Sequence, residues 1–120
     1  MLAVGLDPEF ADFSQFPQLT PALIVAYIRQ QTDRIRDMGL EVVDCLISPD
    51  DAGEQMLKEA LTARAFDCVL IGAGLREPPN MLPLFERVIN RVHRLAPSAS
   101  ICFNTTPADS AEAVQRWIEG

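Results

Sequence analysis

Four short apolar segments alternate with four segments of helical period, and this alternation constrains the fold more than any other feature of the chain. The apolar segments are residues 2–6, 40–47, 68–71 and 100–103. Such an alternation is typical of repeated βα units, whose strands run parallel. The central segments are apolar with little alternation, as in strands that helices cover on both faces. The sequence therefore predicts an α/β fold with a parallel sheet.

End signals predict where the first and third helices lie. Thr20 is a suitable N-cap, Pro21 suits the first helical position and Gly39 suits the residue after the last turn. The first helix should therefore span about residues 21–38. We expect Asn80 to cap the third helix, whose apolar residues recur with a period of 3.6 between residues 84 and 95.

Capping-box spacing predicts where the other two helices begin. Asp51 is followed by Glu54, and Asp109 is followed by Glu112. In a capping box the first side chain bonds the backbone three residues later, and the second side chain bonds back. We therefore expect Asp51 and Asp109 to be the N-caps of the second and fourth helices.

These elements predict one topology. Right-handed crossovers with helices on both faces favour the strand order 2-1-3-4. A length of 120 residues suits one domain. The chain is thus expected to form a single three-layer, Rossmann-like (flavodoxin-like) domain over residues 1–120. Ligands of such sheets bind beyond the carboxyl ends of the strands, at the switch point between the first and third strands.

Charge and composition exclude several classes of partner. The chain has 10 basic and 17 acidic residues and a net charge of −7, whereas nucleic acids and anionic membranes require a basic face. No apolar run approaches the roughly 20 residues that span a bilayer, and no export signal is recognisable, so we expect a cytoplasmic protein. Cys45, Cys68 and Cys102 lie inside predicted strands without a C-x-x-C pair, and we expect them to be reduced and structural.

The loops after the strands contain the candidate ligand-binding residues. Two glycines follow the third strand and would let backbone amides approach a ligand closely. An arginine two residues later has the geometry to hold a carboxylate or phosphate, although it could instead pair with Glu77 beside a tight turn. The predicted binding residues are Asp7, Gly72, Gly74, Arg76, Asn104 and Thr105.

Known cofactor motifs are not recognisable. The third glycine of a dinucleotide fingerprint is missing after Gly74, and the chain lacks a P-loop, so no nicotinamide, flavin or P-loop nucleotide site is predicted. Asp50 and Asp51 are explained by a turn and a helix cap, and no metal site is predicted.

His93 lies in the last turn of the third helix, where the helix C-terminus favours it, so we assign it no catalytic role.

The connection after the first strand is unusually long for a βα loop. Phe10, Phe13 and Phe16 lie within it. These rings either pack on the sheet edge or a neighbouring helix, or they form a lid or a subunit contact. The last alternative would make the protein a homodimer or a larger homo-oligomer.

Three segments resemble the central strand-helix-strand unit of SGNH-type hydrolases. They are residues 66–74 (FDCVLIGAG), 84–97 (LFERVINRVHRLAP) and 99–107 (ASICFNTTP). The resemblance implies catalytic blocks that this chain lacks: residues 4–8 contain no serine, residues 72–75 contain no asparagine, and no Asp-x-x-His block closes the sequence. The whole chain also resembles a group of small uncharacterised bacterial Rossmann-like proteins, and that resemblance implies a fold without an activity.

The sequence supports three functional hypotheses. The first is a cytosolic domain that binds a small anionic metabolite at the carboxyl ends of strands 1 and 3. The second is a divergent SGNH-like or Asp-dependent hydrolase that uses Asp7 as a nucleophile or metal ligand. The third is a non-enzymatic homo-oligomer assembled through the phenylalanine loop or an open sheet edge. Whether the protein is an enzyme, and which cofactor it uses, stay open.

Overall fold

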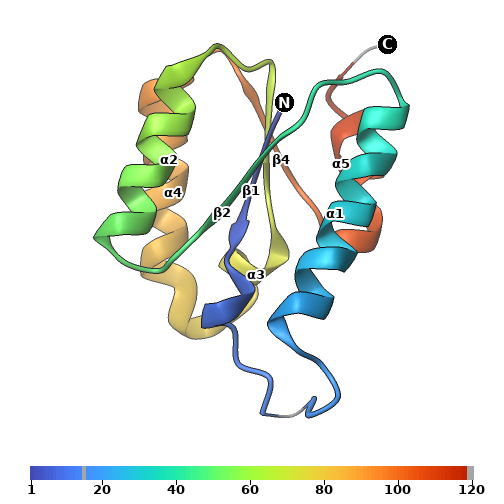
Figure 1. Cartoon of the computed structure of the whole chain (residues 1–120). Helices are drawn as coiled ribbons and strands as arrows, with labels where there is room; N and C mark the ends of the chain where they lie inside the picture. The colour runs from blue at the N-terminus through green and yellow to red at the C-terminus, as the bar shows by residue number, and fades with distance from the viewer. Residues whose placement is uncertain (15, 119–120) are drawn as a thin grey trace.

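A computed structural model describes residues 1–14 and 16–118 as a four-stranded, all-parallel sheet of order β2-β1-β3-β4 between two layers of helices (Figure 1). This confirms the predicted Rossmann-like α/β fold and its strand order. The elements in chain order are β1 (Leu2–Leu6), η1 (Pro8–Phe10), α1 (Pro21–Asp37), β2 (Val43–Ile47), α2 (Asp51–Ala63), β3 (Cys68–Ile71), α3 (Ala73–Arg76), η2 (Pro79–Met81), α4 (Leu82–Leu95), β4 (Ser100–Phe103), η3 (Pro107–Asp109) and α5 (Ser110–Gln115).

The two faces of the sheet carry cores of different size. The larger core lies under α2 and α4, and Leu2, Val4 and Leu6 of β1 point into it. The smaller core lies under α1 and α5 and receives Ala3 from the same strand. Because side chains alternate along a strand, β1 presents large residues to one layer and its smallest residues, Ala3 and Gly5, to the other. This asymmetry decides where the molecule has room for a ligand.

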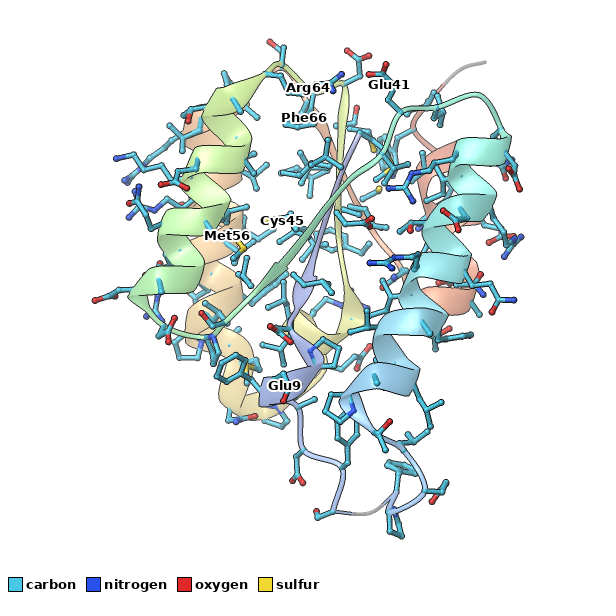
Figure 2. All side chains as sticks on the ribbon, viewed as in Figure 1. Glu9, Glu41, Cys45, Met56, Arg64 and Phe66 are labelled. Atoms are coloured by element: carbon cyan, nitrogen blue, oxygen red, sulfur yellow. The ribbon has the colours of Figure 1, made fainter. Side chains whose placement is uncertain are left out.

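The two ends of the strands, carboxyl and amino, can be distinguished in Figure 2. Glu9 lies beyond the carboxyl ends of the strands, and Arg64 and Glu41 form an ion pair near the opposite edge. The Arg64 guanidinium also lies 5.6 Å from the centre of the Phe66 ring. The long connection from β1 to α1 is therefore on the carboxyl edge, where Rossmann-like sheets bind ligands.

The predicted start of the second helix is wrong by one residue. The N-cap of α2 is Asp50, whose carboxylate accepts a 3.1 Å hydrogen bond from the Gly53 amide, and Asp51 is the first helical residue. The Ser48 hydroxyl also bonds Asp50, and this bond and the Gly53 amide hold the pKa of Asp50 below its usual value. The capping box at Asp51 therefore does not form.

The predicted cap of the third helix is wrong, and the predicted cap of the fourth is right in position only, because Asp109 is the N-cap residue of α5 but makes no side-chain cap hydrogen bond. α4 begins at Leu82 after Met81, without a side-chain cap, because Asn80 lies inside the short turn η2. Before α5 the capping box is formed by Thr106 and Asp109 around η3, one turn earlier than predicted. The sequence pattern located both helices, but it missed the 3₁₀ turns that precede them.

Two boundaries near the sheet also differ from the sequence prediction. β2 begins at Val43 rather than at residue 40, because the preceding residues connect α1 to the sheet edge. Residues after β3, expected to form an open loop, instead form the short helix α3. The backbone amide of Gly72 donates to the Val4 carbonyl at 2.8 Å, so β1 already occupies an amide that was expected to reach a ligand.

The three cysteines lie in the strands, as predicted, and all three are buried and free of disulfide bonds. Cys45 faces the larger core, on the side of α2 (Figure 2), and burial raises the pKa of its thiol to about 11. Cys68 and Cys102 face the smaller core with their sulfur atoms 3.4 Å apart. In the described ranges, 1–14 and 16–118, no helix combines the length and apolarity needed to cross a membrane.

Candidate functional site

A cavity of about 280 Å³ lies between α1 and the sheet. Helix α1 packs mainly against α5, η1 and η3 rather than against the strands. Four residues of the central strand β1 line the cavity, and the two that face this layer are the small residues Ala3 and Gly5, while Val4 and Leu6 point into the larger core. A Cβ atom added at Gly5 would lie 3.1 Å from the Leu46 side chain, which shows how closely the floor is built. The cavity thus exists because β1 presents small residues to α1, and α1 does not pack directly against them.

The cavity wall is largely apolar. Ile24, Tyr27 and Ile28 come from α1, Leu46 comes from β2, and Leu70 comes from β3. An apolar cavity of roughly 150 Å³ suffices to hold one benzene ring. A volume of about 280 Å³ therefore fits a bicyclic molecule of about ten non-hydrogen atoms.

Three of the polar side chains that line the cavity already bond to other protein groups. Thr32 is 2% exposed, and its hydroxyl donates to the Arg29 carbonyl at 3.1 Å. Asn104 accepts from the Ala73 amide at 2.8 Å and donates to the Ser110 hydroxyl at 3.0 Å, and Ser110 donates to the Pro107 carbonyl at 2.7 Å. Because these bonds are satisfied internally, the three side chains fix the wall and leave it receptive to apolar atoms.

Asp44 is the charged member of the lining. Its Oδ2 atom accepts a 2.9 Å hydrogen bond from Arg36, and Arg36 also pairs with Asp33 at 2.8 Å. These two carboxylates, Asp44 more strongly, raise the pKa of Arg36 above its usual value. The guanidinium is therefore permanently charged and shared between two anions at one side of the cavity.

Three of the six predicted binding residues, Gly72, Gly74 and Asn104, line the cavity. The other three lie outside its lining. Asp7 caps η1 by accepting from the Glu9 amide at 3.0 Å. The Thr105 hydroxyl bonds the Asp109 carboxylate at 2.6 Å. The Thr105 backbone amide donates to the same carboxylate at 2.9 Å. Burial raises the pKa of Asp109, but the bonds from Thr105 outweigh it, and the pKa is lower than usual.

Arg76 stabilises the end of β4. Its guanidinium donates to the Asn104 carbonyl at 2.8 Å, pairs with Glu77 at 3.2 Å and lies 5.5 Å from the centre of the Phe103 ring. The pairing with Glu77 is the alternative that the sequence left open for this arginine. Arg76 thus connects α3 to the carboxyl end of β4, beside the cavity and not in its wall.

The phenylalanine loop is only partly packed. Phe13 is half-buried, whereas Phe10 and Phe16 are 48% and 50% exposed. Leu23 and Tyr27, near the start of α1, are exposed as well. The rings therefore do not all pack on the body of the domain.

Sequence reasoning missed the α1 side of the site. Ile24 and Ile28 fall inside the predicted first helix, and Asp44 and Leu46 fall inside the predicted second strand, without any sign that they face a cavity. The sequence did contain one signal for the cavity. Ala3 and Gly5 share one face of the first strand, and two such small residues cannot fill the space up to a helix in the next layer.

The part of the chain that the structure describes contains no group of three His, Cys, Asp or Glu side chains arranged to hold a metal ion. Comparisons of the chain with protein-family models, with curated proteins and with solved structures gave no significant match. The resemblances to SGNH-type hydrolases and to small bacterial Rossmann-like proteins remain predictions. The cavity is therefore the feature of the described residues that bears on function.

Proposed function

We propose that this protein binds a small, mainly apolar molecule in the cavity between α1 and the sheet. The observation that carries the proposal is a cavity of about 280 Å³ with a largely apolar wall, in which the side chains of Thr32, Asn104 and Ser110 are already hydrogen-bonded within the protein. The cavity reaches Gly72, Gly74 and Asn104 at the carboxyl ends of the strands, where Rossmann-like domains bind their ligands.

The geometry supports binding more strongly than catalysis. Asp7, the residue on which the hydrolase hypothesis depends, caps η1 and is not part of the cavity wall. The cavity lining gives no support to the anionic character expected of the ligand, because no Lys, Arg or His side chain is among the lining residues that the structure describes. We retain the small ligand and its position, and we assign it an apolar body.

Indole is a suitable neutral probe because it has nine non-hydrogen atoms in two fused rings. At about 0.5 kcal/mol per atom, a value between the usual limits for small ligands, its dissociation constant would be about 0.5 mM. A titration to several millimolar followed by ¹H–¹⁵N correlation spectra should therefore saturate the site. We expect the amide signals of Ala3, Gly5 and Leu46 to shift the most.

Two tryptophan variants of α1 test whether indole binds in this cavity. Ile28→Trp places a larger side chain in the cavity and should abolish the indole-dependent shifts. Leu23→Trp makes the same kind of change at an exposed position outside the cavity lining and should leave them unchanged. The proposal is wrong if wild type shows no saturable shifts with indole, or if both variants bind indole as wild type does.

A second candidate function, self-association, is favoured by the half-exposed rings of Phe10 and Phe16. Apolar rings in a loop at the ligand-binding edge suit a contact between two copies of the chain. Sedimentation velocity of wild type and a Phe16→Ser variant tests this candidate. A wild-type dimer that becomes a monomer in the variant would support it, and a monomer in both would exclude it.

A further inference from the structure

We propose that the molecule bound in the cavity is an organic amine, with an apolar ring over Gly5 and an ammonium group bonded to Asp44. The inference rests on the proposed function and specifies the ligand class. Three observations carry it: the charge of the lining, the hydrogen bonding of Asp44 and the register of β1 against β2.

The charge of the lining favours a cation. Asp44 is the one charged side chain among the lining residues that the structure describes. Its partner Arg36 also pairs with Asp33, so one positive charge faces two negative charges in this group. An ammonium ion would balance the excess negative charge, whereas a carboxylate or phosphate would add to it. The net charge of −7 over the whole chain acts in the same direction.

The hydrogen bonding of Asp44 leaves capacity for a ligand. Oδ2 accepts the bond from Arg36, and within residues 1–14 and 16–118 no donor bonds Oδ1. A carboxylate has about four acceptor positions, and a partner that is itself charged makes the stronger kind of hydrogen bond. Asp44 therefore differs from Thr32, Asn104 and Ser110, whose hydroxyl and amide groups bond within the protein.

The strand register sets the distance between the two ends of the ligand. Asp44 lies opposite Ala3, and Leu46 lies opposite Gly5, two residues further along β2. Two residues of a parallel strand span about 6.6 Å. A two-carbon chain between an aromatic ring and an ammonium group covers a span of this order, so a ring over Gly5 and Leu46 can carry an ammonium group as far as Asp44. The register thus points to an arylethylamine.

Three indole derivatives that differ in charge test the inference by isothermal titration at pH 7: tryptamine is a cation, indole is neutral and indole-3-acetate is an anion. We expect tryptamine to bind wild type about tenfold more tightly than indole, because a charge-assisted hydrogen bond adds roughly this factor. Indole-3-acetate should bind less tightly than indole. The preference for the cation should fall as the salt concentration rises.

Two matched variants identify the carboxylate. Asp44→Asn keeps the size of the side chain and removes its charge, and we expect it to bind tryptamine no more tightly than indole. Asp33→Asn removes the other anion that pairs with Arg36, at a position outside the cavity lining. It should reduce the preference for tryptamine without abolishing it, because the group loses one negative charge while Asp44 can still bond the ammonium ion. Unchanged indole affinity in both variants would show that they are folded.

The outcomes separate this inference from the proposed function. If indole binds wild type but tryptamine binds no more tightly, or if Asp44→Asn keeps the preference, the amine assignment is wrong and the cavity remains a binding site. Tighter binding of indole-3-acetate than of tryptamine would also overturn the assignment. If none of the three probes binds wild type, both proposals fail.

Discussion

Replacing Asn104 by alanine should destabilise the fold strongly, even though the sequence marked this residue as a ligand contact. Its side chain is 4% exposed and joins three separate parts of the chain. Oδ1 accepts from the Ala73 amide at the start of α3, and Nδ2 donates to the Ser110 hydroxyl at the start of α5. The substitution therefore removes the side-chain bonds from the end of β4 to both helices, while the bond from Arg76 to the backbone carbonyl of residue 104 remains.

The expected loss follows from those two bonds. Each hydrogen bond contributes about 1 kcal/mol net, and the Ala73 amide left without its acceptor costs about 1 kcal/mol more. The free energy of unfolding should fall by about 3 kcal/mol in total. At about 4 °C per kcal/mol for a domain of this size, the melting temperature should fall by about 12 °C.

Urea unfolding followed by far-ultraviolet circular dichroism measures this loss. Thr105→Val is the matched control, because it removes an exposed hydroxyl from the neighbouring residue and should cost less than about 1 kcal/mol. Equal losses in the two variants, or a loss below about 1 kcal/mol for Asn104→Ala, would refute the structural role. Asn104 would then be available to bind a ligand, as the sequence suggested.

Three further predictions concern backbone space, thiol reactivity and pH. Gly53→Ala should prevent stable folding, with a loss of unfolding free energy above about 4 kcal/mol, because the new Cβ would lie 1.8 Å from the Ser48 carbonyl oxygen. Gly74→Ala is the control: its Cβ would lie 3.7 Å from the nearest atom, on Leu6, and this variant should fold normally in the same urea titration. Native protein at pH 8 should show no fast-reacting thiol with an aromatic disulfide reagent, since the cysteines are buried and the pKa of Cys45 is raised to about 11, and all should react in urea. The lowered pKa of Asp50 stabilises the fold above the pKa of the unfolded chain, near 4, and this contribution is lost as the pH falls through the lower folded value. Wild type should consequently lose more unfolding free energy than Asp50→Asn between pH 6 and pH 3, and equal losses would contradict this assignment.

The sequence predicted the sheet well because the signals for buried parallel strands are local. Continuous apolar runs mark strands that are covered on both faces, and the right-handed crossover of parallel strands leaves few permitted topologies. The strand bounds 2–6, 68–71 and 100–103 agree with the structure, and so does the order of all four strands. The helix starts were predicted less well, since Asp50 and Asp51 are chemically equivalent caps and only the three-dimensional turn selects one of them.

The candidate site was predicted only in part, because it depends on the distance between layers. Gly72, Gly74 and Asn104, which the pattern of strand ends singled out, line the cavity. The same pattern could not show that Asn104 and Arg76 would be engaged by α3, α5 and β4. Nor could it show that α1 would pack mainly against α5, η1 and η3 rather than against the strands. The spacing of apolar residues along a helix shows which face is buried, but not how far the helix lies from the neighbouring layer.

The alternation along β1 separates the packing of the larger core from the shape of the cavity, two properties that usually constrain each other in a small protein. Leu2, Val4 and Leu6 fill the larger core, while Ala3 and Gly5 form the floor of the cavity. Changes of volume at positions 3 and 5 therefore alter the shape of the cavity while the residues that fill the larger core stay the same. If the cavity binds a ligand as proposed, a lineage of such domains could diverge in ligand choice through these two positions, and a protein engineer could use them to reshape the cavity.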